Sequence, residues 1–182
     1  MNQDADCVIV GGGIGGAVLG LALGRLGRRV AVLERAAVPA TMGRPEVLAG
    51  TTIETFRRLG VGDRMLQEAV VRLEGLSVDE AGDRRLLSIT RDDFHRAGVQ
   101  PYSTDPARTR QILLEQAQAT SSIEVQRGVE VKELLREGTR IVGVRGTRGG
   151  QRLEWRARVV VGDDGGQSRV RAGMGIPLKT RD

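Results

Sequence analysis

Residues 7–34 read CVIVGGGIGGAVLGLALGRLGRRVAVLE, in which two short apolar runs flank a glycine-rich turn and an apolar segment. The two runs are typical of parallel strands that are buried on both faces. Between them, apolar side chains recur at helical spacing over about residues 15–26, and Gly27 is placed to end that helix. The stretch therefore predicts a strand–turn–helix–strand unit, with Glu34 at the end of the second strand.

The turn in this unit carries the spacing Gly-x-Gly-x-x-Gly. Gly11 allows a tight turn, Gly13 lets a pyrophosphate approach the backbone, and Gly16 lets the helix pack closely on the strand. The start of the helix offers free N–H groups and a positive dipole end to phosphates. Glu34 follows at about the distance where a carboxylate accepts hydrogen bonds from ribose hydroxyls. The motif predicts a dinucleotide-binding site and leaves open whether the dinucleotide is NAD or FAD.

The composition excludes several other classes of protein. With one cysteine and one histidine, Cys7 and His95, the chain has no internal disulfide framework, and neither a Cys/His zinc site nor a serine-hydrolase triad is expected. The net charge of +5 comes from scattered, mostly arginine side chains beside acidic ones, and aromatic residues make up only 2%. Nucleic-acid binding is therefore not expected. Without a membrane-length apolar run or a leader-like start, we expect a cytoplasmic protein.

The rest of the chain alternates between further predicted helices and strands. Residues 36–50 look irregular and residues 90–104 are ambiguous. Asp105-Pro106 is a strong helix start, because it combines a capping acid with proline at the first helical position. The remaining predicted elements are helices near 51–59 and 63–70, a hairpin over 73–89 with its turn at 80–83, strands at 123–125 and 129–135, a hairpin of 139–147 with 152–157, and a strand at 159–161.

Four segments resemble the FAD-dependent aromatic hydroxylases, the single-component class related to p-hydroxybenzoate hydroxylase. The last of them is the most specific, because it resembles the Asp-Gly fingerprint of that family. The segments are the first strand–turn–helix–strand unit at 4–35, GRPEVL at 43–48 with TFRRLG at 55–60, RTRQIL at 108–113, and VVVGDDGGQSRVR at 159–171.

The resemblance implies a set of cofactor-binding residues. Its members would hold the FAD pyrophosphate, the adenosine ribose and adenine, or the flavin region, and Asp164 would take the Asp-Gly role linked to both FAD and NAD(P)H. Asp163 stands where the family usually carries alanine, so two adjacent carboxylates compete for that role. The residues so implied are Gly11, Gly13, Ile14, Gly15, Gly16, Glu34, Arg35, Arg44, Arg110, Val131, Asp164 and Gly165.

The resemblance also implies an activity. NAD(P)H would reduce bound FAD, and oxygen would pass through a flavin hydroperoxide to an aromatic or other electron-rich small molecule. A related FAD-dependent reductase or halogenase is the nearest alternative, and a non-catalytic or truncated FAD-binding module is an alternative of another class. No acid–base pair in the sequence stands out as catalytic.

The implied architecture is α/β, with a Rossmann-like FAD-binding domain made of a parallel sheet with helices and a small β-meander. Residues 1–72 and 105–182 would form that domain, which is discontinuous and incomplete. Residues 73–104 would be the first strands of an incomplete substrate-domain sheet. The family's later Gly-Asp motif has no counterpart in the 182 residues. We therefore expect a C-terminal remainder of the same enzyme, or else a truncated gene.

Overall fold

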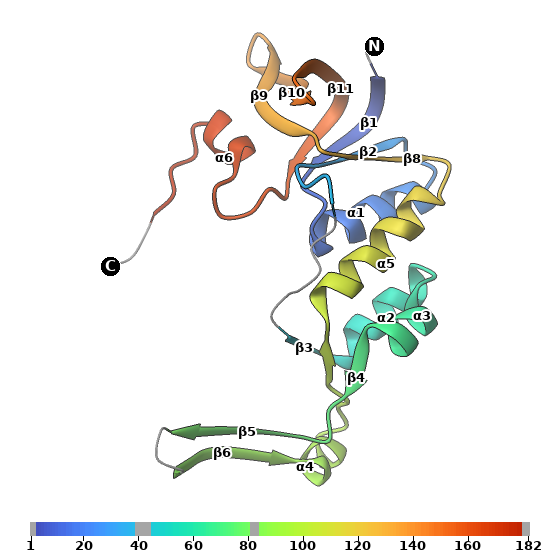
Figure 1. Ribbon diagram of the computed structural model, residues 1–182, viewed down its shortest axis with the longest axis vertical. Helices are drawn as coiled ribbons and strands as arrows, with labels where there is room; N and C mark the ends of the chain where they lie inside the picture. The colour runs from blue at the N-terminus through green and yellow to red at the C-terminus, as the bar shows by residue number, and fades with distance from the viewer. Residues whose placement is uncertain (1–2, 39–44, 81–83, 180–182) are drawn as a thin grey trace. The chain divides into compact units, whose positions relative to one another are not determined.

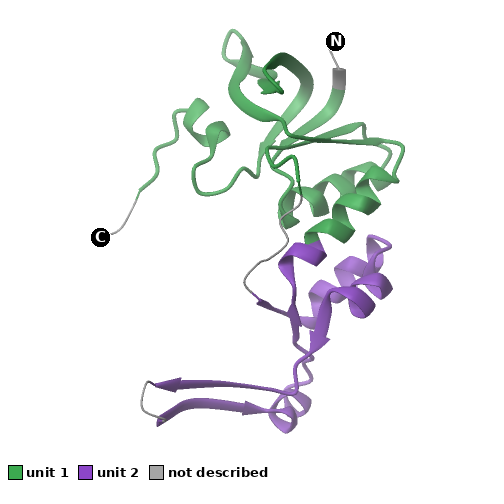
Figure 2. Ribbon diagram, in the orientation of Figure 1, with its two compact units in different colours: residues 1–40, 110–182 green, residues 41–109 purple. Residues whose placement is uncertain are grey.

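The computed structural model describes residues 3–38, 45–80 and 84–179 (Figure 1). The chain divides into two compact units (Figure 2). Unit 1 comprises residues 1–40 and 110–182, and unit 2 comprises residues 41–109. These units are defined by packing, so the partition into a FAD-binding part and a substrate part stays a prediction.

The described part of unit 1 is built on a six-stranded sheet in the order β8-β2-β1-β11-β10-β9. The neighbours β8, β2, β1 and β11 run parallel, and β9, β10 and β11 form an antiparallel meander. This arrangement confirms the predicted α/β class with a mostly parallel sheet. The strands are β1 (Gln3–Val10), β2 (Val30–Glu34), β8 (Ile123–Arg127), β9 (Glu130–Glu137), β10 (Arg140–Arg148) and β11 (Gln151–Gly162).

The central strands are buried on both faces because their side chains alternate between two apolar layers. On one face, Val8, Val10 and Leu33 join a cluster with residues of the meander, including Trp155. On the other face lies α1 (Ile14–Arg25), whose Gly20 comes close to Ile9 and Val32. Figure 1 shows α1 and α5 (Pro106–Gln118) on the same side of these strands. Gly27, with φ +73°, follows α1 as predicted.

β11 corrects one sequence-based expectation. Two strands were predicted at 152–157 and 159–161, but the structure has one strand through the whole segment. Arg158 interrupts the apolar pattern, yet the backbone pairing with β1 continues on both sides of it, from Ala157 to Val159. A polar side chain on one face does not break the hydrogen-bonded ladder, so the local pattern alone placed a false boundary there.

Unit 2 combines a helical layer with two small sheets. One sheet has the order β3-β7-β4, and the other is the hairpin β5-β6. The predicted face of the first helix is confirmed, because Ile53 and Phe56 are buried. The elements are β3 (Glu46–Leu48), α2 (Gly50–Arg58), α3 (Gly62–Glu68), β4 (Val70–Arg72), β5 (Gly75–Glu80), β6 (Arg84–Thr90), α4 (Arg91–Arg96) and β7 (Tyr102–Thr104).

The segments expected to be irregular or ambiguous also contain regular structure. β3 lies in one of them, and it forms by pairing with the distant β7, where Glu46 faces Thr104. α4 lies in the other and begins with a capping box between Thr90 and Asp93. Most of the turn expected at 80–83 lies outside the described residues.

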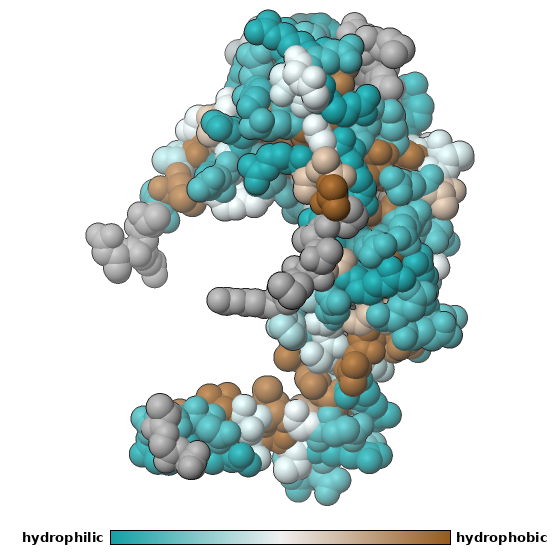
Figure 3. All heavy atoms as spheres, in the orientation of Figure 1, coloured by the Kyte–Doolittle hydropathy of each residue, from teal (hydrophilic) through white to brown (hydrophobic). Residues whose placement is uncertain are grey.

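The hairpin of β5 and β6 leaves apolar side chains in solvent (Figure 3). Leu76, Val78, Leu86 and Leu87 are each 40–54% exposed. An isolated two-stranded ribbon is at best marginally stable in water without a further apolar layer. Among the described residues, no helix is both long enough and apolar enough to cross a membrane.

Candidate functional site

A cleft of about 670 Å³ opens in unit 1 at the carboxyl ends of β1, β2 and β11. This is the edge at which open α/β sheets bind ligands. Its lining mixes acidic, basic and apolar side chains with the glycine-rich turn. The lining residues are Val10, Gly11, Gly13, Leu33, Glu34, Arg35, Arg110, Val129, Glu130, Val131, Asp163, Asp164, Gly165, Gly166, Gln167 and Arg169.

The glycine-rich turn has the geometry that its spacing predicts. Gly11 adopts φ +113°, and a Cβ atom there would lie 2.2 Å from the carbonyl oxygen of Asp163. A Cβ atom on Gly16 would lie 2.1 Å from the carbonyl oxygen of Gly11. The turn, the start of α1 and the loop after β11 therefore pack together without room for side chains at these two positions.

The first turn of α1 begins beside the cleft: Gly13 lines it, whereas the predicted site residues Ile14, Gly15 and Gly16 are not among its lining residues. Gly16 N–H donates to Asp163 Oδ2 at 2.7 Å. Within the part of the chain that the structure describes, the amides of Gly13, Ile14 and Gly15 have no hydrogen-bond partner. Unpaired amides at the positive end of a helix dipole favour an anion.

Glu34 lies at the end of β2, where the sequence placed it. Its Oε2 accepts a hydrogen bond from Gly12 N–H at 2.9 Å, and its Oε1 accepts one from Ala36 N–H at 2.7 Å. These two bonds fix the carboxylate at the rim of the turn. Each oxygen keeps a further lone pair, so the group can still accept a hydrogen bond from a ligand.

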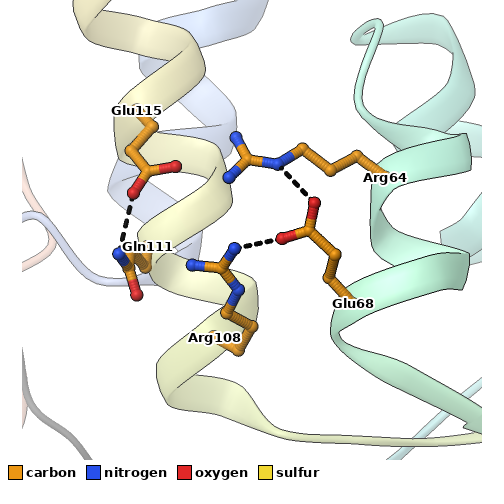
Figure 4. A network of polar contacts seen from close by, with 5 residues as sticks. All are labelled: Arg64, Glu68, Arg108, Gln111 and Glu115. Atoms are coloured by element: carbon orange, nitrogen blue, oxygen red, sulfur yellow. Dashed lines mark hydrogen bonds and ion pairs between the residues drawn. The ribbon is translucent and has the colours of Figure 1, made fainter.

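The two arginines at the start of α5 have different environments. Arg108 pairs with Glu68, which Arg64 also contacts (Figure 4). Hydrogen bonds from these two arginines lower the pKa of the Glu68 carboxyl. Arg110 instead lines the cleft, and its buried Nη2 has no hydrogen-bond partner among the described residues. A buried cationic donor without a partner is costly, which indicates that a ligand completes this site.

The two adjacent carboxylates after β11 also have different contacts. Asp163 faces the first turn of α1, as its bond to Gly16 shows. Asp164 turns toward α6 (Arg169–Gly173), where it accepts hydrogen bonds from the Ser168 hydroxyl and from the Arg169 amide. The carboxylate of Asp164 therefore supports the helix that follows it, although the residue also lines the cleft.

The remaining predicted residues are distributed as follows. Arg35, Val131 and Gly165 line the cleft, and Arg44 lies outside the described residues. Seven further lining residues were not predicted as site residues: all lie in predicted strands or in the segment at 159–171, but neither signal gave these positions a role. These are Val10, Leu33, Val129, Glu130, Gly166, Gln167 and Arg169.

Glu130 shows how charges converge on the rim of the cleft. A hydrogen bond from the Lys132 ammonium lowers the pKa of the Glu130 carboxyl, and the charges of Arg35 and Arg169 lower it further. Arg35 and Arg169 come from opposite ends of the chain. Only the fold brings them to the same carboxylate, so no sequence spacing could have indicated the group.

Comparison with known proteins connects this chain with a family of cofactor-binding domains. A family model described as "FAD binding domain" matches residues 4–182. The "Probable NADH-specific resorcinol 4-hydroxylase" of Rhodococcus jostii is 34% identical over 179 residues, covering 97% of this chain and 34% of its own length.

Two solved structures have a similar fold. Pseudomonas aeruginosa PqsL in complex with 2-aminobenzoylacetate matches with a TM-score of 0.80 at 27% identity, over 99% of this chain and 48% of its own. Pseudomonas putida p-nitrophenol 4-monooxygenase PnpA matches with a TM-score of 0.84 at 20% identity, over 96% and 44%. The chain therefore spans about a third to a half of the length of these proteins.

Proposed function

The chain belongs to the FAD binding domain family, and we propose that it is the FAD-binding portion of a flavoprotein monooxygenase that hydroxylates an aromatic small molecule. The observation that carries the proposal is the cleft at the glycine-rich turn. Its lining combines the unpartnered amide of Gly13 at the start of α1, the carboxylate of Glu34 and the guanidinium of Arg110, whose buried Nη2 has no partner among the described residues.

The anionic part of FAD has suitable partners in this cleft. We assign the diphosphate to the amides of Gly13, Ile14 and Gly15, which have no other partner among the described residues. Gly13 lines the cleft, and without a side chain it leaves its backbone open to close approach by a ligand. Arg110 would donate to the cofactor through the Nη2 group that otherwise stays buried and unsatisfied.

The adenosine part of FAD also has suitable partners. Glu34 is held by two backbone N–H groups and has lone pairs left for ribose hydroxyls. Arg35 lies beside it, and the buried Val131 lines the same cleft from β9. A carboxylate suits the ribose hydroxyls and an apolar side chain suits the adenine ring. These properties support the assignment of the ribose to Glu34 and of the adenine to the region of Val131.

The reaction depends on the cofactor, which when bound accepts hydride from NAD(P)H and activates oxygen. The chain's own contribution is to bind and orient that cofactor through the residues named above. We do not assign a catalytic acid or base to a residue of this chain. The aromatic substrate and the use of NADH or NADPH as reductant are part of the proposal. The name of the Rhodococcus relative, "Probable NADH-specific resorcinol 4-hydroxylase", supports an aromatic substrate and a nicotinamide reductant.

The proposal includes a further portion of the enzyme beyond these residues. The exposed apolar side chains of β5 and β6 support the assignment of residues 73–104 to a substrate-binding sheet that other strands complete. The partial coverage of the relatives supports it as well. Sequencing the gene past Asp182 tests this part, because an in-frame stop without a downstream Gly-Asp segment would contradict it. A cytoplasmic location is also proposed, and cell fractionation tests it.

A titration of the purified chain with FAD tests the binding function. The proposal predicts saturable binding with a change in flavin absorbance and fluorescence. A chain that stays colourless and binds no added FAD refutes it. With the complete polypeptide, NAD(P)H oxidation and oxygen uptake should both rise when a phenolic substrate is added, and a hydroxylated product should form. Oxidation that no aromatic compound stimulates would favour the non-catalytic module instead.

A further inference from the structure

Asp163 places its carboxylate against the start of α1, where we also assign the diphosphate of FAD. Its backbone N–H donates to the carbonyl oxygen of Val10 at 2.8 Å, which fixes the residue at the end of β11. Its side chain reaches across to α1, where Oδ2 accepts the hydrogen bond from Gly16 N–H at 2.7 Å. The two partners are 147 residues apart in sequence, so this contact is created by the fold.

The carboxylate of Asp163 lies close to three glycines at the start of α1, Gly13, Gly15 and Gly16. A Cβ atom on Gly13 would lie 3.3 Å from its Oδ2, and one on Gly15 would lie 2.9 Å from its Oδ1. These are the glycines whose amides have no partner in the described structure. Asp163 therefore occupies the anion-attracting end of the helix. Asp164 does not share this position, because its carboxylate bonds to the start of α6.

We propose that Asp163 is a resident anion that competes with the FAD diphosphate and lowers the affinity of the chain for FAD. The inference rests on the proposed function, since it assumes that the diphosphate binds at α1. A carboxylate at a helix N-terminus is stabilising, but a fixed carboxylate beside a diphosphate repels it. Asp163 is exposed, so water screens much of that repulsion. We expect the net penalty on FAD affinity to be roughly tenfold.

The test compares the wild-type chain with Asp163→Asn and Asp163→Ala by calorimetric titration. Asparagine removes the charge and keeps an oxygen that accepts from Gly16 N–H. Alanine removes both, so it should also lower the melting temperature of the cofactor-free chain. The matched control is Asp6→Asn, which changes the net charge equally but lies outside the cleft, where Asp6 Oδ2 accepts from Arg29 N–H. The ligands are FAD and ADP, which share the diphosphate.

The expected result is that Asp163→Asn binds FAD and ADP roughly tenfold more tightly than wild type, with a smaller gain at high salt. Asp6→Asn should bind like wild type. Affinity that is unchanged or weaker in both Asp163 variants overturns the inference, and a gain of equal size in Asp6→Asn also overturns it. If wild type binds FAD and the Asp163 variants bind it equally, only this inference fails. If no variant binds FAD, the proposed function fails with it.

Discussion

The close contact between Gly11 and the loop after β11 can be tested by adding one methyl group. Gly11→Ala places a Cβ atom 2.2 Å from the carbonyl oxygen of Asp163 and 2.6 Å from its carbonyl carbon. Both atoms belong to the backbone, so no side-chain rotation relieves the clash. The residue also has φ +113°, where a side chain is strained. The backbone strain should cost about 1–2 kcal/mol and the overpacking about 1–3 kcal/mol. Together they predict that Gly11→Ala lowers the free energy of unfolding by about 2–5 kcal/mol.

Gly27→Ala is the matched control for this substitution. Gly27 also has a positive φ, +73°, but a Cβ atom there would meet nothing within 4 Å. The Gly27→Ala variant therefore has the backbone strain without the clash, and we expect its free energy of unfolding to fall by only about 1 kcal/mol. The difference between the two variants isolates the contact with Asp163.

The free energy of unfolding is measured by urea denaturation of the cofactor-free chain. Trp155 is the single tryptophan and is buried in unit 1, so its fluorescence follows the unit that contains the cleft. We expect Gly11→Ala to be less stable than Gly27→Ala by about 1–4 kcal/mol, and to bind FAD more weakly. Losses that agree within about 0.5 kcal/mol would show that the loop after β11 does not pack on the turn as described.

Three further predictions concern charged and buried side chains. Arg110→Ala should weaken FAD binding by about ten- to a hundredfold in a fluorescence titration, because it removes an unpartnered cationic donor from the cleft, whereas Arg108→Ala should not. Hydrogen bonds from Thr90 and then Arg96 lower the pKa of Asp93 to about 2, so its stabilisation of α4 is present above its ordinary value of 3.8 and is lost as pH falls toward 2. An NMR titration checks this, and an ordinary Asp93 pKa would contradict it. Burial, and secondarily Asp6, raises the pKa of the Cys7 thiol, so a disulfide reagent at pH 8 should react about a hundredfold more slowly with folded than with unfolded chain. Equal rates would show that Cys7 is exposed.

The parts of the fold that depend on local sequence were predictable. The apolar runs gave β1 and β2, the helical spacing gave α1, and Asp105 caps α5 as expected, with its Oδ1 accepting from Ala107 N–H. Each of these signals lies within one element or at its end. The family resemblance and the fold class were confirmed by the comparisons and by the sheet.

The parts that depend on distant contacts were not predictable. β3 forms only because β7 pairs with it, and the continuity of β11 through Arg158 depends on the ladder to β1. Within the cleft, the spacing placed Glu34 and the glycines, since one motif contains them. Spacing alone could not separate Arg108 from Arg110, because the distinction depends on which face of α5 meets Glu68, and only the family resemblance singled out Arg110.

We expect FAD to bind in the cleft at the glycine-rich turn. A titration of the isotopically labelled chain with FAD, followed through its backbone amide NMR signals, tests it most directly. The shifted amides should cluster at 11–16, 34–35, 129–131 and 163–166, and the amides of the β5–β6 hairpin should stay unchanged. No shifts at millimolar FAD, or shifts confined to residues outside the cleft, would contradict it.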